Sequence, residues 1–285
     1  MIEYFTDPFG SAIAQRALVG GLVIATLAAL IGTWVIIRGL AFLGDALAHG
    51  VLPGLAIGVL WGINLTLAGF VSALAMVAGV NLVHRTTRLS DDTGIGLLFV
   101  GMLALGVVII SRNSTYAGDL TSFLFGDILG VTRGDIVVGL VALGITIVAL
   151  VLGHRSFLAL AVNHEKAAAL GLRPGLAHAA MLALLALAVV VSFQVVGTLL
   201  VFGFLVAPPA TAVLLVRRIP RTMAVAVLFA WLSVVIGIVV SYHADTATST
   251  TIAGVSVAVF FVVLAAVELG SALGRSAAAA PVSGV

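Results

Sequence analysis

An acid and an imidazole stand four residues apart in the stretch GDALAHGVLPG (44–54), at the start of an apolar segment. On a helix, residues i and i+4 share a face with their Cβ atoms about 5–6 Å apart, so Asp45 and His49 can approach one cation together. Carboxylate oxygen and imidazole nitrogen both ligate zinc at about 2.0–2.2 Å. Two ligands do not complete a site, but a two-fold dimer that brings a second pair would supply four. An incomplete site also suits transport, in which the ion must leave again.

The same pair has a purely structural explanation, and the spacing alone does not decide between the two. Asp is a favoured N-cap, so Asp45 could cap a helix, and a buried His49 could simply bond to backbone. The Gly50, Pro53 and Gly54 that follow predict either a kink or close backbone packing. An acid inside a bilayer costs about 2.5 kcal/mol or more on insertion scales, so Asp45 is expected to face a partner or a watery path.

The composition places most of the chain in lipid. Of the 285 residues, 62% are hydrophobic and only 8% are charged, whereas a soluble domain has about 25% charged residues. The net charge of +2 comes from few charges in total and indicates no nucleic-acid partner. There is no cysteine, which excludes disulfides and thiolate metal sites.

Apolar runs of about 20 residues predict an all-α, polytopic membrane protein with nine membrane-crossing helices. Eight full spans plus one broken segment would suit the sequence nearly as well, and the seventh, with Pro208-Pro209, is expected to be bent or partly re-entrant. We expect an external N-terminal segment at 1–12, one transmembrane domain at 13–272 and a disordered cytoplasmic tail at 273–285. The expected spans are 13–38, 45–62, 64–83, 92–111, 134–153, 177–195, 196–216, 222–242 and 250–272.

Basic residues orient these spans. With nine spans and the N-terminus outside, ten of the 13 lysine and arginine residues fall on the cytoplasmic side. The outer loops instead collect acids, among them Asp245. The sequence therefore predicts a multi-pass protein of the cell membrane whose N-terminus is outside and whose C-terminus is cytoplasmic.

No motif for nucleotide hydrolysis is present. A phosphate-binding loop reads G-x-x-x-x-G-K-[ST], but the only lysine, Lys166, follows no glycine loop. Transport would then be driven by an ion gradient or by a separate ATPase. His243, in SYHADTATST at an outer end, is a further candidate to meet an arriving cation, although an ordinary loop histidine is the commoner reading.

Several stretches together resemble the membrane subunit of the ABC-3 class of metal-ion ABC importers, which carry zinc, manganese or iron. Three shorter stretches, GTLLVFGFLVAPPATA, SYHADTATST and DPF, are most similar to the actinobacterial-type zinc permeases. The segments that carry the family resemblance are FLGDALAHGVLPGLAIG (42–58), SDDTGIGLLFVGMLALGVVIIS (90–111), LTSFLFGDILGV (120–131), NHEKAAALGL (163–172) and FQVVGTLLVFGFLVAPPATAVLL (193–215).

The resemblance implies a type II ABC importer-like fold, a homodimer in membrane lipid, two copies of a cytoplasmic ATP-binding subunit, and an external metal-binding protein. It also implies that Asp45 and His49 line the translocation pathway. The cytoplasmic loop at about 154–176 would carry the helix that couples to the ATPase. The implied coupling residues are His164, Glu165, Lys166, Ala169 and Gly171.

From these observations we expect a transport subunit that is not itself an enzyme and holds no permanent cofactor. Its substrate would be Zn²⁺ first and Mn²⁺ second. The alternative from another class is a secondary metal/proton exchanger that needs no ATPase, in which Asp45 and His49 would exchange protons for the ion.

Overall fold

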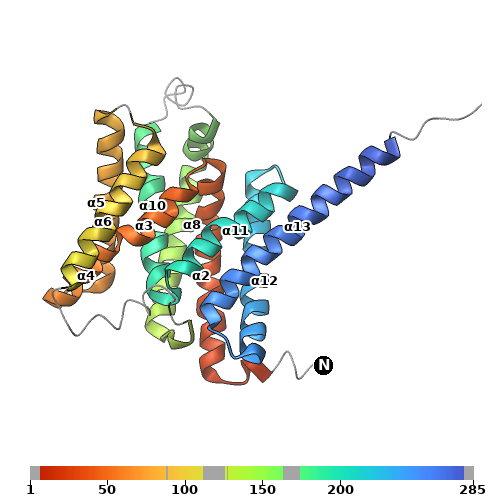
Figure 1. Cartoon of the computed structure of the whole chain (residues 1–285), viewed down its shortest axis with the longest axis horizontal. Coiled ribbons are helices and arrows are strands. Elements are labelled where there is room, and N and C mark those ends of the chain that lie inside the picture. Colours follow the sequence, from red (N-terminus) through yellow and green to blue (C-terminus); the bar gives the residue numbers. More distant parts are fainter. Residues whose placement is uncertain (1–6, 88, 112–125, 127, 163–173, 279–285) are drawn as a thin grey trace, which may run out of the picture.

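The structure is a computed structural model that describes residues 7–87, 89–111, 126, 128–162 and 174–278. Every regular element in these residues is helical (Figure 1). The elements are η1 (Asp7–Phe9), α2 (Ala12–Ile37), α3 (Ala41–Gly50), α4 (Leu52–Trp61), α5 (Leu65–Thr86), α6 (Asp91–Ser111), η3 (Ile128–Gly130), α8 (Arg133–Val162), α10 (Pro174–Val196), α11 (Thr198–Leu215), α12 (Ile219–Ala244) and α13 (Thr248–Ala278).

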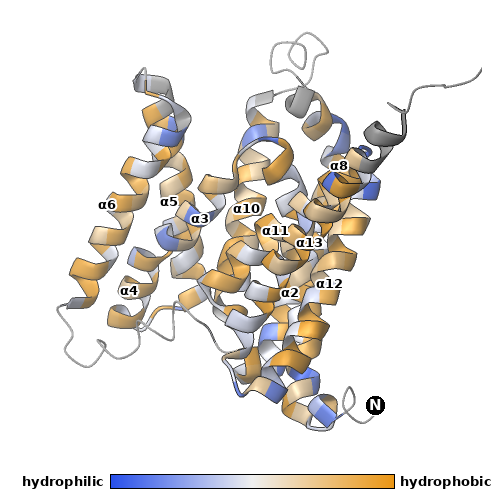
Figure 2. Cartoon of the chain, turned by 45° about the vertical axis from the view of Figure 1, so that its right-hand side comes forward, coloured by the Kyte–Doolittle hydropathy of each residue, from blue (hydrophilic) through white to orange (hydrophobic). Residues whose placement is uncertain are grey.

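Nine helical spans within the described ranges are long and apolar enough to cross a membrane, which confirms the predicted all-α, polytopic class. The helices α3 and α4 together form the second of these spans, Ala41–Trp61. Figure 2 shows that hydrophobic residues dominate the helices, as expected where lipid and other helices are the only surroundings.

Capping residues and a left-handed glycine mark the ends of several of these helices. The Oγ atom of Ser11 accepts a hydrogen bond from the N–H of Ala14 and caps α2. At the turn between α4 and α5, Gly62 adopts a left-handed conformation with φ 65°, which has no Cβ penalty in glycine. Asn64 then caps α5 by accepting from the N–H of Leu67.

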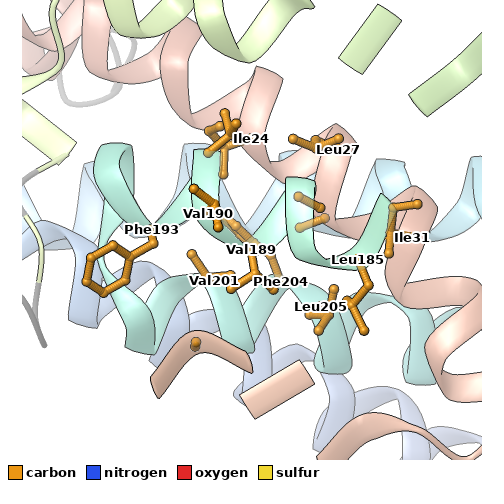
Figure 3. Packing of buried hydrophobic residues seen from close by; sticks show 14 of the residues in the cluster. Ile24, Leu27, Ile31, Leu185, Val189, Val190, Phe193, Val201, Phe204 and Leu205 are labelled. Atoms are coloured by element: carbon orange, nitrogen blue, oxygen red, sulfur yellow. The ribbon is translucent and has the colours of Figure 1, made fainter. Parts of the chain in front are cut away.

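The buried centre of the bundle is made by α2, the α3–α4 span, α10 and α11. In their most apolar stretches 61–72% of the residues are buried, compared with 17–22% in α5, α6, α8 and α13. Because lipid tails are as apolar as leucine, this centre is held by close packing rather than by removal from water. Figure 3 shows the packing of Ile24, Leu27 and Ile31 from α2, Leu185, Val189, Val190 and Phe193 from α10, and Val201, Phe204 and Leu205 from α11.

The partly re-entrant alternative for the seventh span is wrong, because α11 continues as one spanning helix through Pro208 and Pro209. A proline at position 209 removes the N–H that would bond to the carbonyl of Leu205. That carbonyl lies against Gly32 of α2, so closely that a Cβ at Gly32 would collide with it. A neighbouring helix thus packs tightly on the freed carbonyl, and the break lies in the second span instead.

Two boundaries differ from those predicted. The helix α8 runs to Val162 and α10 begins at Pro174, so both helices extend into the loop predicted at 154–176. Phe157 explains the extension of α8, because it is buried and its ring lies 5.8 Å from that of Trp34 in α2. At the C-terminus, α13 continues past the expected end of the domain at residue 272 to Ala278, and its last part extends beyond the other helices (Figure 1).

Candidate metal centre

The second span is interrupted one residue after His49. The helix α3 ends at Gly50, Val51 is the shared cap, and α4 begins with Leu52 and Pro53. The Ser72 hydroxyl of α5 enters the interruption, donating to the carbonyl of Gly50 at 2.7 Å and accepting from the N–H of Gly54 at 3.2 Å. A side chain inserted into the helical hydrogen-bond ladder is a recognised cause of a kink.

The glycines of this segment also serve close packing. A Cβ added at Gly50 would collide with the side chain of Met76, and one at Gly54 would collide with the carbonyl of Ala68, both in α5. The predicted alternatives, kink or close packing, are therefore both realised. Together they hold α3 and α4 firmly against α5.

Asp45 lies inside α3, whose N-cap is Leu40, so the capping explanation for this acid is wrong. The Nε2 atom of His49 lies 4.0 Å from Oδ1 of Asp45. Both side chains are partly accessible, 19% for His49 and 33% for Asp45. The structure therefore brings the predicted pair together on one accessible face of a half-span.

This geometry fits a transition metal after a small closing movement. Two ligands at about 2.1 Å from one ion with a tetrahedral angle lie about 3.4 Å apart, slightly less than the 4.0 Å between Oδ1 of Asp45 and Nε2 of His49. The Nδ1 atom of His49 is buried and has no hydrogen-bond partner within the described part of the chain. Nε2 is thus the nitrogen that faces the acid and is available to a cation.

One aromatic ring adjoins His49 and a second packs on the first, and the sequence reasoning identified neither. The ring of Phe99, from α6, lies 5.2 Å from the His49 imidazole with an interplanar angle of 82°. The ring of Phe42, at the start of α3, lies 6.3 Å from that of Phe99. The only available signal was the seven-residue spacing from Phe42 to His49, which places both on one helix face.

The remaining predicted residues do not join the pair. His243 lies at the exposed C-terminal end of α12, where its Nδ1 lies 2.9 Å from the carbonyl oxygen of Val239. Across the residues with assigned positions, no three His, Asp or Glu side chains are close enough to hold a metal ion. The five predicted coupling residues, His164, Glu165, Lys166, Ala169 and Gly171, lie outside the described residues.

Among the described residues, nine helical spans and an accessible carboxylate–imidazole pair define a polytopic membrane protein with a candidate cation site between its helices. The model of the ABC 3 transport family matches residues 11–267. The chain belongs to this family. Its homologues are membrane subunits of ABC transporters, and the chain is likewise a transport subunit and not an enzyme.

The relatives cover the chain nearly from end to end. A "probable iron transport system membrane protein" of Haemophilus influenzae is 33% identical over 265 residues, covering 93% of this chain and 97% of the relative. The "manganese transport system membrane protein MntC" of Listeria monocytogenes is 32% identical over 250 residues, covering 87% and 88%. Neither is named for zinc, so the predicted closeness to actinobacterial zinc permeases is not confirmed.

A solved structure confirms the permease architecture. The structure described as PsaBC from Streptococcus pneumoniae in complex with Fab superimposes with a TM-score of 0.83 and 26% identity, over 92% of this chain and 95% of that one.

Proposed function

We propose that the chain is the permease subunit of an ATP-driven importer of a divalent transition-metal ion. The observation that carries the proposal is the Asp45–His49 pair, with Nε2 and Oδ1 4.0 Å apart, partly accessible, and next to a break in its own span. An acid and an imidazole among apolar helices are costly unless they serve a partner or a path. A cation that passes between the subunits would meet both.

The names of the relatives change the expected order of metals. They are named for iron and manganese, so we place Mn²⁺ and Fe²⁺ before Zn²⁺, which remains the competitor to be tested. Carboxylate and imidazole bind all three ions. Intrinsic affinity at such a site rises from Mn²⁺ to Fe²⁺ and is higher still for Zn²⁺, so selection has to come from geometry and delivery.

A second copy of the chain would complete the site. Each protomer contributes one carboxylate and one imidazole, and a two-fold axis beside α3 would present four ligands to one ion. We propose a homodimer assembled with two ATP-binding subunits and supplied by an external metal-binding protein. This assembly is supported by the family to which the chain belongs.

We also propose that the N-terminus is outside and that residues 164–171 contact the ATPase. The end of the bundle at which α2 finishes carries Arg38, Arg155, Arg217, Arg218 and Arg221, the asymmetry expected of a cytoplasmic face. The end of α8 at Val162 and the start of α10 at Pro174 lie at this same end, and residues 163–173 lie between them in the sequence. A coupling element belongs there if ATP is hydrolysed on that side.

The test is metal uptake by cells that express the full chain with its ATPase and binding protein. We expect Asp45→Asn and His49→Ala each to abolish uptake of Mn²⁺ and Fe²⁺ while membrane insertion and assembly persist. Asp245→Asn is the matched control, because Asp245 is an exposed cap with φ 49°, a conformation that asparagine tolerates. His243→Ala, run in parallel, measures whether His243 contributes at the outer end.

Normal uptake by both pair variants would refute the site. Disabling the ATPase should also stop uptake. Uptake that instead followed the pH gradient without any ATPase would identify the secondary exchanger.

A further inference from the structure

Within the part of the chain that the structure describes, the imidazole of His49 lacks the contact that usually orients a metal-ligating histidine. Such a histidine normally donates its second ring N–H to a carboxylate, a carbonyl or water, which fixes the ring and raises its basicity. Here Nε2 faces Asp45, while Nδ1 is buried and has no hydrogen-bond partner among the residues that the structure describes. Something other than a hydrogen bond at Nδ1 must hold the ring.

The phenyl ring of Phe99 is placed to do so. It lies 5.2 Å from the His49 ring, and the two planes are 82° apart, which is the T-shaped arrangement favoured by aromatic pairs. Rotation of the imidazole about its Cβ–Cγ bond would disrupt this contact. Phe42 packs on Phe99 in turn, with ring centroids 6.3 Å apart, so the phenyl ring is itself supported by α3.

The helix that carries Phe99 is fixed against the break in the second span. Gly106 lies seven residues after Phe99 and therefore on the same face of α6. A Cβ added at Gly106 would lie 3.0 Å from Cβ of Leu52 and 3.2 Å from the nitrogen of Pro53. The α6 backbone thus contacts the α3–α4 junction directly. We infer that this contact fixes where Phe99 lies along the α6 axis relative to His49.

We propose that Phe99 is a positioning residue that orients the His49 imidazole for metal binding. The proposal rests on the proposed function, since it concerns the same pair. An apolar ring orients the ligand without making it more basic, as a carboxylate partner would. The result is a site with a defined geometry but moderate affinity, which suits an ion that must be released.

The experiment measures Mn²⁺ binding to the full chain in lipid nanodiscs, by titration and by the nitrogen coupling of bound Mn²⁺ in pulsed electron paramagnetic resonance. The wild type should show a histidine nitrogen coupled to Mn²⁺, and His49→Ala should lose it. Phe99→Leu should weaken Mn²⁺ binding about 10- to 100-fold, the usual effect of removing a group that orients a ligand, and should broaden the nitrogen coupling. Phe99→Tyr, which keeps the ring, should stay near the wild type.

Phe229→Leu is the matched control, because Phe229 is also a half-buried phenylalanine but lies on α12, and it should bind Mn²⁺ as the wild type does. Phe99→Met replaces Phe99→Leu if the leucine variant is not monodisperse. Wild-type affinity and coupling in the leucine or methionine variant would overturn the positioning role alone. Absence of histidine-coupled Mn²⁺ in the wild type would overturn the metal site and the positioning role together.

Discussion

Ser72 of α5 donates its hydroxyl hydrogen to the carbonyl of Gly50 in α3 at 2.7 Å. In an uninterrupted helix that carbonyl would accept from the N–H of Gly54. Here the N–H of Gly54 donates to the Ser72 oxygen instead, at 3.2 Å. One hydroxyl therefore stands in place of one helical hydrogen bond, one residue after His49, and it lets the half-span that carries Asp45 and His49 change direction without leaving these two backbone groups unpaired.

Ser72→Ala should destabilise the protein by about 1–3 kcal/mol, because it removes the hydroxyl that pairs two buried backbone groups. The measurement is the free energy of unfolding in mixed micelles, together with metal uptake, which should also fall. Ser192→Ala is the control, since the Ser192 hydroxyl is buried but has no hydrogen-bond partner in the described structure, and its removal should be neutral or stabilising. Equal effects of the two substitutions would contradict the bridging role.

Gly32→Ala should lower the free energy of unfolding by about 1–3 kcal/mol, the usual effect of overpacking. The added methyl would meet the backbone carbonyl of Leu205, which cannot turn away as a flexible side chain can. Gly101→Ala is the matched control, because nothing lies within 4 Å of a Cβ added there. Alanine at that helical position should stabilise the protein by up to about 1 kcal/mol, so the two changes should have opposite signs.

The indole N–H of Trp231 in α12 donates to the hydroxyl of Thr26 in α2 at 2.9 Å. This bond joins two spans, and the Trp231 side chain remains exposed on the bundle surface. A double-mutant cycle with Trp231→Phe and Thr26→Val should give a coupling energy of about 0.6 kcal/mol, the mean measured for hydrogen bonds between membrane helices, and at most about 1.7 kcal/mol. A coupling energy of zero would show that the two spans are held by packing alone.

Arg38, just after α2, donates from Nη1 to Nδ1 of His178 in α10 at 3.0 Å. Burial lowers the pKa of the Arg38 guanidinium, but an arginine side chain is not deprotonated in proteins, so the group stays charged at neutral pH. Nδ1 of His178 must then be the acceptor, with the proton on Nε2. Nitrogen NMR should show an unprotonated Nδ1 at His178, and Arg38→Met should change this signal while leaving that of His154 unchanged.

Much of the fold could be predicted from the sequence, for a simple reason. A bilayer requires each span to satisfy its own backbone, so every span appears in the sequence as a long apolar run. The nine predicted spans accordingly match the helices found. The pair was predictable because the i, i+4 spacing within one helix places Asp45 and His49 together without any tertiary contact.

The position of the break was not predictable in the same way. Both Pro53 and the pair Pro208-Pro209 remove helical hydrogen bonds, and the sequence allowed a kink or a bend at either location. In the structure the helix breaks beside Pro53 and continues through Pro208-Pro209. Whether a helix breaks depends on which neighbouring residue contacts the backbone group that each proline leaves unpaired. Gly32 packs against the freed carbonyl in α11, while Ser72 inserts its hydroxyl beside Pro53.

The sequence by itself determined that the chain crosses a membrane in eight or nine apolar helices and that a carboxylate and an imidazole share one helix face. Only the tertiary structure decided that this helix breaks after His49 and that Phe99 of a different span packs on its imidazole. The reason is physical. Burial in lipid and helical periodicity act within a single segment, whereas a kink and the orientation of a ring are settled by groups from segments far away in the chain.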